Sequence, residues 1–373
     1  MAVRTWLPTD RRLAFGAGEF AGALGDSVTV LPLVVALGAV TPAPLPQILL
    51  WFGAFQVVWG LWYGLPLSVE PMKALLALAV AGSLAYGELL AAGLLAAVAL
   101  LALGSLGVLE RVQSLVGRPV VRGVQLAVAL LLARAGLRLA AGDLRFALAG
   151  VALAVGVAAV GRARLAALVV LTAGTLWALL AGGLPVPTVP VPAVFPAGRP
   201  TLSGTAVSGT LAQLAMTVGN AAVATSLLLG DLFDADVSPD RLARSMGAMD
   251  VVAIPLGGLP MCHGSGGLAG KYAFGARTGG ANVLLGLLYV GAAAVAGVWS
   301  AFPMATLGVL LVVVAAQLGR VAVDSDGLPV TVAVGVLAVL TTVGVAFLVG
   351  AAYWLARQRL PVDFPFWGPS GRS

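Results

Sequence analysis

Two stretches of the chain have the residue types and spacing to hold an anion. They are residues 64–73, GLPLSVEPMK, and residues 258–267, GLPMCHGSGG. Proline and glycine interrupt the apolar sequence in both, so we expect a helix to begin inside each stretch, with Pro71 in the first turn of the first helix. Unpaired N–H groups and the dipole at a helix N-terminus bind oxyanions. The sequence thus predicts two half-helices, beginning near Pro71 and Gly264, that together hold an anion.

Side chains in and near these stretches could complete the site. Lys73 could offer a positive charge to an oxyanion, or it could pair with Glu70. A carboxylate at Glu70 would repel an oxyanion unless it is protonated or paired. His263 could donate to the oxyanion, although a single histidine beside a turn also serves as a structural donor. Gln213 lies seven residues before Asn220 on one expected helix, so the two could line a polar stripe.

The composition places these stretches in a membrane. Of the 373 residues, 60% are hydrophobic and 10% are charged, whereas soluble domains carry roughly 45–50% apolar and about 25% charged residues. We therefore expect an all-α polytopic membrane protein embedded in the lipid bilayer, not a soluble enzyme or a nucleic-acid-binding protein. The single cysteine, Cys262, and the single histidine, His263, exclude a disulfide framework and a multi-histidine metal centre. No metal, cofactor or catalytic residue is predicted.

Fourteen apolar segments are expected to be membrane spans, since about 20 helical residues cross a bilayer. They are residues 13–38, 47–64, 66–83, 88–107, 122–138, 145–160, 165–182, 203–229, 243–257, 259–275, 281–299, 303–319, 328–341 and 342–356. The last two are short and could instead form one tilted helix or a shallow hairpin.

Basic residues indicate the orientation of these spans. With the N-terminus in the cytoplasm, most arginines and lysines fall on the inner side, as the positive-inside rule requires. Arg122, Lys271 and Arg277 belong to this inner set and are expected to act as orientation signals. We therefore predict an integral plasma (inner) membrane protein with cytoplasmic N- and C-termini.

The chain contains an internal repeat. A shift of 194 residues aligns Leu24-Gly25-Asp26 with Val218-Gly219-Asn220, FGAFQVV at 52–58 with MGAMDVV at 246–252, and the two Gly-Leu-Pro motifs. Seven spans in each half is an odd number, so the second half must enter the membrane from the opposite side. Inverted repeats of this kind are typical of transporters, whose substrate site lies where two broken helices meet.

A proline-rich segment separates the two halves. Residues 183–200 are expected to form an extended linker, because proline fixes φ and removes a hydrogen-bond donor. The predicted organisation is a first seven-span repeat at 1–182, this linker, and an inverted second repeat at 201–373, with no soluble domain.

The repeat also pairs polar residues inside the spans. Asp26 aligns with Asn220, and Gln56 aligns with Asp250. An ionisable residue in a membrane is a candidate for ion coupling, and hydrogen bonding between helices is the structural alternative. Glu19 lies about two helical turns before Asp26 and shares its face. The proton-coupling candidates are Glu19, Asp26, Glu70 and Asp250.

Five segments of the chain resemble the molybdate transporter family, a relative of the sulfate permeases that lacks their STAS domain. They are GEFAGALGDSVTVLPLVVAL (18–37), SVEPMKALLALA (68–79), RGVQLAVALLLA (122–133), LAQLAMTVGNA (211–221) and GGLPMCHGSGGLAGKYAFGARTGG (257–280). The resemblance runs from about Gly16 to Gly319. It implies a seven-plus-seven transmembrane inverted repeat with core and gate (scaffold) domains, uptake of molybdate, and a homodimer as one oligomeric state.

The family motifs and the two stretches together give the predicted substrate-binding residues. These are Asp26, Glu70, Pro71, Met72, Lys73, Gln213, Asn220, His263, Gly264, Ser265, Gly266 and Gly267. The chain departs from the family pattern at Glu70, where glutamine is usual, at Ala221, where serine is frequent, and at Lys271, where glutamine is common.

The sequence therefore predicts a transporter for a tetrahedral oxyanion, molybdate first and sulfate second, that works by alternating access. Proton coupling is a further hypothesis. A proton-coupled nucleobase permease of the same architecture is the alternative, which the Glu70 carboxylate favours. The lack of a histidine cluster, a second cysteine and a Gly-x-Ser-x-Gly motif argues against a membrane-embedded enzyme. An uncoupled anion channel is a further alternative.

Overall fold

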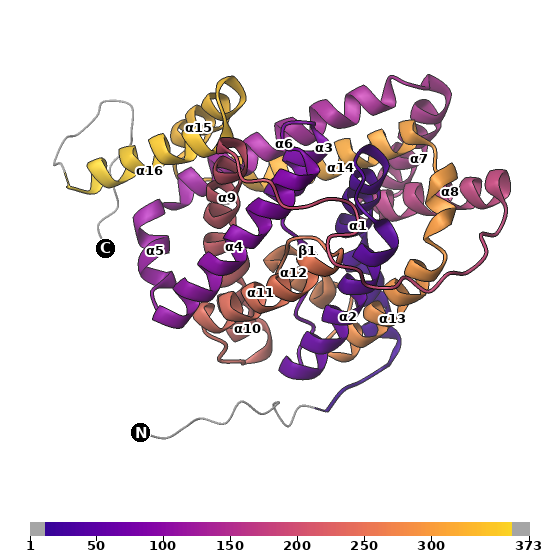
Figure 1. The fold of residues 1–373 in the computed structure, drawn as a ribbon, viewed down its shortest axis with the longest axis horizontal. Helices are drawn as coiled ribbons and strands as arrows, with labels where there is room; N and C mark the ends of the chain where they lie inside the picture. Colours follow the sequence, from indigo (N-terminus) through magenta and orange to yellow (C-terminus); the bar gives the residue numbers. More distant parts are fainter. Residues whose placement is uncertain (1–11, 360–373) are drawn as a thin grey trace.

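The computed structural model describes residues 12–359, most of which are helical (Figure 1). The first half of the chain forms α1 (Ala17–Val40), α2 (Leu45–Tyr63), β1 (Glu70–Pro71), α3 (Lys73–Val80), α4 (Tyr86–Leu106), α5 (Leu109–Val116), α6 (Arg118–Ala140), α7 (Leu144–Ala159) and α8 (Ala166–Gly182). The second half forms α9 (Gly204–Met216), a π-helical segment (Thr217–Val223), α10 (Ala224–Phe233), α11 (Pro239–Ala253), β2 (Met261–Cys262), α12 (Ser265–Ala273), α13 (Gly280–Ala294), α14 (Met304–Val323), α15 (Leu328–Leu340) and α16 (Val343–Arg359). Short 3₁₀ turns lie at Ala163–Leu165, Ile254–Leu256 and Ala296–Ala301.

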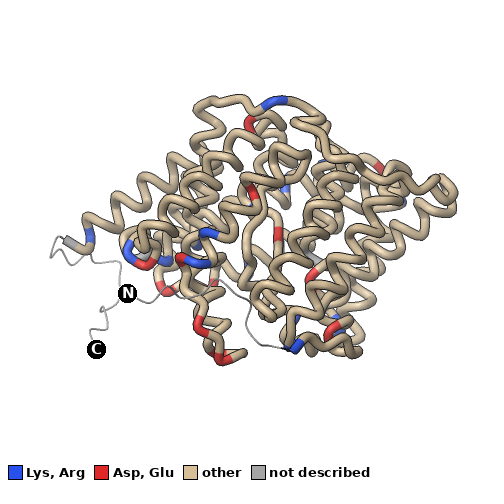
Figure 2. The backbone as a smooth tube through the Cα atoms, turned by 60° about the horizontal axis from the view of Figure 1, so that its bottom comes forward, with Lys and Arg blue, Asp and Glu red and all other residues tan. Residues whose placement is uncertain are grey.

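Several of these helices have the length and composition of membrane spans. Within residues 12–359, six helical segments are long and apolar enough to cross a bilayer. They are Ala17–Val40, Leu45–Tyr63, Tyr86–Leu106, Arg118–Ala140, Gly204–Phe233 and Met304–Val323. Charged residues are sparse along the backbone, and a few of them lie in the middle of the bundle (Figure 2). Charges buried at that depth are expected to be paired or functional.

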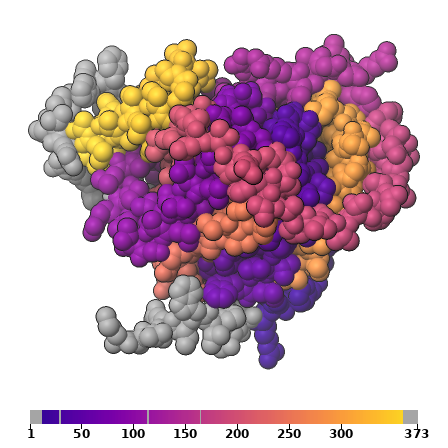
Figure 3. Space-filling view, viewed as in Figure 1, coloured from indigo at the N-terminus to yellow at the C-terminus, as the bar shows by residue number. Residues whose placement is uncertain are grey.

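The helices pack into two bundles, each built from both halves of the chain. The core bundle contains α1–α4 and α9–α13, and the scaffold bundle contains α6–α8 and α14–α16. In the core, α2 packs on α13 and α4 packs on α11, while in the scaffold α6 packs along α14. Segments from the two halves alternate across the molecular surface (Figure 3). α11 is the repeat counterpart of α2, and α13 is that of α4. The α2–α13 contact is therefore equivalent to the α11–α4 contact, as an inverted repeat requires.

Paired glycines allow the closest of these helix contacts. A methyl group built on Gly53 of α2 would meet the carbonyl oxygen of Gly286 on α13, and one built on Gly286 would meet that of Gly53. Gly136 of α6 and Gly308 of α14 face one another in the same way. Small residues let helix backbones approach closely in membranes, where packing rather than hydrophobic exclusion holds helices together.

The two half-helices follow a pair of crossing strands at the centre of the core bundle. β1 and β2 are antiparallel, with Glu70 opposite Cys262 and Pro71 opposite Met261. Each strand leads into a half-helix, α3 or α12, and the antiparallel pairing makes the two half-helices approach from opposite directions. The prediction of two broken helices is confirmed.

Pro71 lies one element earlier than the sequence predicted. It belongs to β1, Met72 is the extended N-cap residue, and α3 begins at Lys73, so the prediction that Pro71 occupies the first helical turn is wrong. Pairing with β2 keeps this segment extended, since the Met72 N–H donates to the Pro260 carbonyl at 2.8 Å. Proline accepts an extended strand as readily as a first helical turn, because its fixed φ suits both.

Three further segments compare with the predicted spans. Residues 183–203, which include the predicted linker at 183–200, form no helix or strand. α15 and α16 are separate short helices that pack on one another, so residues 328–356 do not form the single tilted helix that was one alternative. The short helix α5 was not predicted, because eight residues are too few to show a helical period.

Candidate functional site

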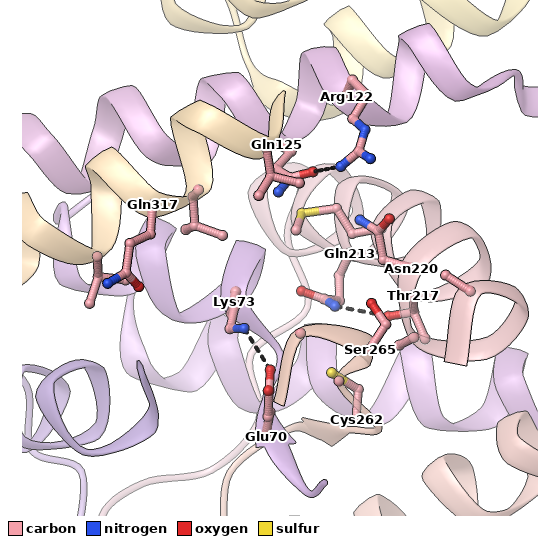
Figure 4. Close-up of a pocket in the computed structure, with 18 residues that line it drawn as sticks. Glu70, Lys73, Arg122, Gln125, Gln213, Thr217, Asn220, Cys262, Ser265 and Gln317 are labelled. Carbon is pink, nitrogen blue, oxygen red and sulfur yellow. Dashed lines mark hydrogen bonds and ion pairs between the residues drawn. The ribbon is translucent and has the colours of Figure 1, made fainter. Parts of the chain in front are cut away.

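A polar cavity of about 370 Å³ lies where the two half-helices meet (Figure 4). Its wall comes from the β1–α3 and β2–α12 segments, from α9 and the π-helical segment, and from the scaffold helices α6 and α14. The polar side chains on the wall are those of Glu70, Lys73, Arg122, Gln125, Gln213, Thr217, Asn220, Cys262, Ser265 and Gln317. Both repeats and both bundles therefore contribute to one cavity.

Lys73 and Glu70 form an ion pair on this wall. Lys73 Nζ lies 2.5 Å from Glu70 Oε2, and the side chains are 18% and 2% exposed, respectively. Glu70 stands in β1 and Lys73 is the first residue of α3, so a short extended step brings the two charges together. The sequence left open whether Lys73 faces the site or pairs with Glu70, and the structure places it in both arrangements at once.

The Glu70 carboxylate also lies against the first turn of α12. A methyl group built on Gly264 or Gly267 would overlap this carboxylate, and at Gly267 it would also meet the carboxylate of Asp26 and the hydroxyl of Ser68. Gly264 has φ −93°, which any residue adopts, so glycine is required there for space and not for conformation. Glu70 Oε1 is buried and has no hydrogen-bond partner among residues 12–359. A carboxylate thus occupies the positive end of the α12 dipole.

The N-terminus of α3 is covered by a different side chain. Gln213 Oε1, from α9, accepts hydrogen bonds from the N–H groups of Ala74 at 3.0 Å and Leu75 at 3.4 Å. Gln213 Nε2 in turn donates to Thr217 Oγ1 at 2.8 Å. The amide oxygen therefore satisfies first-turn N–H groups that a helix leaves without internal partners. Gln213 belongs to the second repeat and caps a half-helix of the first.

Behind the cavity, Asp26 forms a fully buried ion pair with Lys271. Asp26 Oδ2 lies 3.2 Å from Lys271 Nζ and accepts a hydrogen bond from Ser68 Oγ at 2.6 Å. Lys271 Nζ also donates to Gln56 Oε1 at 3.2 Å and to Asn282 Oδ1 at 2.7 Å. The prediction that Lys271 is an orientation signal at the membrane surface is wrong, because its position on α12 directs it at Asp26 of α1 inside the core bundle.

Two of the proton-coupling candidates lie away from the cavity. Glu19 Oε1 accepts hydrogen bonds from the N–H groups of Arg277 and Thr278, both at 3.0 Å, in the loop after α12. Asp250 Oδ1, on α11, accepts a hydrogen bond from the N–H of Met261 at 2.7 Å. Each carboxylate fastens backbone of the second repeat and does not line the cavity wall.

His263 is also held by protein partners. Its Nε2 lies 2.7 Å from Ser245 Oγ, and its Nδ1 lies 3.1 Å from the carbonyl oxygen of Ser68. The side chain is fully buried and does not line the cavity. Both ring nitrogens are therefore engaged, in accordance with the structural alternative for this histidine.

The predicted binding residues divide into two groups in the structure. Those on the cavity wall are Glu70, Lys73, Gln213, Asn220, Gly264, Ser265 and Gly266. Those off the wall are Asp26, Pro71, Met72, His263 and Gly267, which lie in the strands or directly behind the wall. Sequence reasoning missed Arg122, Gln125 and Gln317, the polar residues contributed by the scaffold.

Arg122 and Gln125 carried a signal that could have identified them. They are polar residues three positions apart in the first half of a predicted span, and Arg122 Nη1 donates to Gln125 Oε1 at 3.1 Å. We counted Arg122 among the surface orientation signals, yet it faces the cavity. A charge one turn inside a span is as compatible with a site as with the membrane surface, and sequence alone does not separate the two.

A second cavity lies beside the first. It has a volume of about 470 Å³ and shares Arg122, Asn220 and Ala224 with the first cavity. Arg118 lies on its wall, has a side chain that is 70% exposed, and stands 3.4 Å from Asp326. The two cavities are therefore neighbours, and both have Arg122 of α6 on their walls.

An inverted repeat whose broken helices meet at a polar cavity defines an integral, multi-pass membrane transporter. A family profile described as "Molybdate transporter of MFS superfamily" matches residues 18–132 and 205–318, one segment in each half. The chain belongs to this molybdate transporter family. It is an anion transporter and not an enzyme.

Curated relatives agree with this family, and solved structures agree with the fold. Molybdate transporter 2 of Arabidopsis thaliana is 28% identical over 83% of this chain and 80% of its own length. Molybdate transporter 1 of Chlamydomonas reinhardtii is 29% identical over 89% of both chains. The transmembrane domain of the cyanobacterial bicarbonate transporter BicA matches 92% of this chain and 99% of its own, with a TM-score of 0.65 and 17% identity. Murine Slc26a9, an anion transporter, matches 96% of this chain and 71% of its own, with a TM-score of 0.70 and 14% identity.

Proposed function

We propose that the chain takes up molybdate across the plasma membrane and holds it in the cavity between α3 and α12. The observation that carries the proposal is the convergence of Lys73, the first turn of α12 and Arg122 on one cavity. Relatives that are 28% and 29% identical bear the name molybdate transporter, which supports molybdate as the anion.

The wall has the donors that a tetrahedral dianion needs. Lys73 supplies a point charge, and the Arg122 guanidinium can bind two oxygens at once. Ser265 and Gly266 are the first two residues of α12, so their N–H groups have no acceptor inside the helix and can donate to an anion. Uncharged donors from Gln125 and Gln317 complete the set. Sulfate is the second candidate, because these donors recognise charge and tetrahedral shape, which the two anions share.

Alternating access is the proposed mode of transport. The core bundle carries the half-helices and the scaffold bundle carries Arg122 and Gln317, so a rigid movement between bundles would open the cavity to one side and then the other. The exposed Arg118 lies on the wall of the second cavity, and the positive-inside rule favours the cytoplasmic side for it. In this assignment both termini are cytoplasmic and the structure is open inward. We propose residues 1–182 and 201–373 as the two repeats and leave a homodimer as a prediction.

Coupling to protons is the second part of the proposal. Of the four candidate carboxylates, Glu70 lies on the cavity wall and Asp26 lies directly behind it, whereas Glu19 and Asp250 hold backbone elsewhere. A carboxylate next to a bound dianion is unfavourable unless it takes up a proton. Glu70 is therefore the proposed coupling residue.

Uptake of radiolabelled molybdate into proteoliposomes tests this function. We expect saturable uptake that rises at acid outside pH and that unlabelled tungstate or sulfate inhibits. The Lys73→Gln variant is expected to reduce this uptake strongly at low molybdate concentration, and Asp231→Asn, on the exposed end of α10, is the matched control. Uptake that is independent of outside pH would contradict proton coupling. Inhibition by uracil in place of oxyanions would contradict the substrate class.

A further inference from the structure

We propose that the Glu70 side chain is a tethered competitor of the transported oxyanion. Its carboxylate lies against both Lys73 and the N-terminus of α12, and it must take up a proton before the oxyanion binds there. The inference rests on the proposed function, since it specifies when that site accepts its anion.

The geometry that supports this role is the double engagement of one carboxylate. Glu70 Oε2 lies 2.5 Å from Lys73 Nζ, and the same group fills the space above Gly264 and Gly267 at the start of α12. Glu70 is 1% exposed although it stands on the cavity wall, and its Oε1 has no hydrogen-bond partner among the described residues. An oxyanion that uses Lys73 and the α12 dipole needs the positions that Glu70 now fills, so the two anions exclude one another.

Gly264 and Gly267 make this arrangement possible. Any larger residue at either position would displace the Glu70 carboxylate from the start of α12. Gly266, between them, faces open space, and a methyl group there would contact nothing within 4 Å. Gly264 and Gly267 therefore leave the space that the Glu70 carboxylate fills, whereas Gly266 lies outside that space.

The charged surroundings favour neutral Glu70 once Lys73 is taken by another anion. The titratable and charged groups that face Glu70 are Lys73 on α3, Asp26 on α1, Lys271 on α12, Cys262 on β2, Tyr289 on α13 and, across the cavity, Arg122 on α6. Lys271 is engaged by Asp26. When an oxyanion occupies Lys73, Glu70 has the Asp26 carboxylate beside it at Gly267 and a second anion at its former partner, and neighbouring like charges favour the protonated form.

The exchange balances in simple terms. One proton moves from water to a Glu70 oxygen, the ion pair with Lys73 separates, and the oxyanion takes over Lys73 and the α12 N-terminus. No covalent bond of the oxyanion changes. Each oxyanion that binds in this way brings one proton with it.

Molybdate binding to the full-length protein in lipid nanodiscs tests the inference. In wild type, apparent affinity is expected to fall by up to about tenfold per pH unit as Glu70 loses its proton, because the anion binds only the competent fraction. Glu70→Gln removes the competing charge and keeps the shape, so it is expected to bind molybdate at least about tenfold more tightly than wild type at alkaline pH and to lose the pH dependence. Asp231→Asn, the matched carboxylate-to-amide control, is expected to behave as wild type.

Infrared difference spectra give a readout that is independent of affinity. Addition of molybdate to wild type is expected to produce a protonated carboxylic acid band that is missing in Glu70→Gln. Weaker binding by Glu70→Gln, or an unchanged pH dependence, would overturn the inference while molybdate transport stands. If wild type binds sulfate but not molybdate, the same comparison made with sulfate tests Glu70, and only the choice of substrate fails. A protein that binds neither anion at any pH would overturn both proposals.

Discussion

The two half-helices are repeat counterparts, yet their N-termini are covered in opposite ways. α3 begins with Lys73 and is capped by the neutral amide oxygen of Gln213. α12 begins among glycines and has no capping side chain of its own, and the Glu70 carboxylate lies on its first turn. In each case the covering side chain comes from the other repeat. A neutral cap can stay in place while an anion binds, whereas a carboxylate has to be neutralised or moved.

The surroundings of the two half-helices differ in the same sense. Under α12, Asp26 and Lys271 form a buried ion pair. Their repeat counterparts, Asn220 and Ala77, are uncharged. α3 therefore contributes a charged side chain to the cavity. α12 contributes backbone N–H groups, and the buried Asp26–Lys271 pair is its ionic support.

The largest expected effect comes from breaking the ionic support under α12. Asp26→Asn leaves Lys271 buried with uncharged amide partners only, and the loss of one partner of a buried pair costs about 3–5 kcal/mol of the free energy of unfolding. Thermal or denaturant unfolding in detergent measures it. The double change Asp26→Asn with Lys271→Gln is expected to recover most of the loss, and Asp231→Asn to cost less than about 0.5 kcal/mol. An Asp26→Asn protein as stable as wild type would show that the pair does not support α12.

The next effect concerns the charge that α3 contributes. Lys73→Gln is expected to weaken molybdate binding by about 1.5–3 kcal/mol, the contribution typical of a hydrogen bond to a charged group. Binding in nanodiscs measures the change. Because Lys73→Gln also leaves Glu70 without its partner, the comparison is made in a Glu70→Gln background, where both proteins are expected to fold. Equal affinity with and without Lys73 in that background would mean that α3 does not contribute charge to the site.

The space above α12 gives an intermediate effect. Gly264→Ala is expected to cost about 1–3 kcal/mol of stability, because its methyl group would overlap the Glu70 carboxylate. Gly266→Ala, two residues along, is the control and is expected to be neutral for stability. Adding Glu70→Ala to Gly264→Ala is expected to remove the penalty, and a double-mutant cycle of unfolding free energies measures the coupling. No coupling would show that the carboxylate and Gly264 do not compete for space.

The smallest effect concerns the cap of α3. Gln213→Ala removes the acceptor for the N–H groups of Ala74 and Leu75, at an expected cost of about 1 kcal/mol of stability. Gln213→Glu is expected to keep the cap and the stability, yet to weaken molybdate binding because it adds a second carboxylate to the wall. Stability and binding are measured on the same samples. A Gln213→Glu protein that binds molybdate as wild type does would show that this end of the cavity is not used by the anion.

The sequence located the half-helices because their signals are local. Proline and glycine mark where a helix cannot continue, and the 194-residue repeat relates the two interruptions to one another. The partners that cover the half-helices could not be predicted in the same way. Gln213 and α3 are about 140 residues apart in the sequence. Which polar side chain of α9 reaches the N–H groups of α3 depends on the rotation of α9 about its axis, which the sequence does not give.

Two charged residues were wrongly predicted to lie at the membrane surface, because hydropathy does not tell which way a side chain faces. Lys271 lies near the end of a short apolar segment, where a cation is normally at the membrane surface, yet the shortness of α12 places it beside Asp26. Arg122 follows the start of α6 by four residues and faces inward. In a broken helix the usual relation between sequence position and membrane depth no longer holds, because the helix starts at the centre of the molecule.

Under the proposed alternating access, Arg122, Gln125 and Gln317 on scaffold helices would make the ligand shell of the anion a composite of two bodies. Movement of one body past the other would remove some ligands from the shell while the remainder travel with the ion. Occupancy and conformation would then be thermodynamically linked, with the anion held most tightly in the alignment in which both bodies contribute. Release on the far side would need no separate trigger, since the movement that exposes the ion would also remove part of its shell.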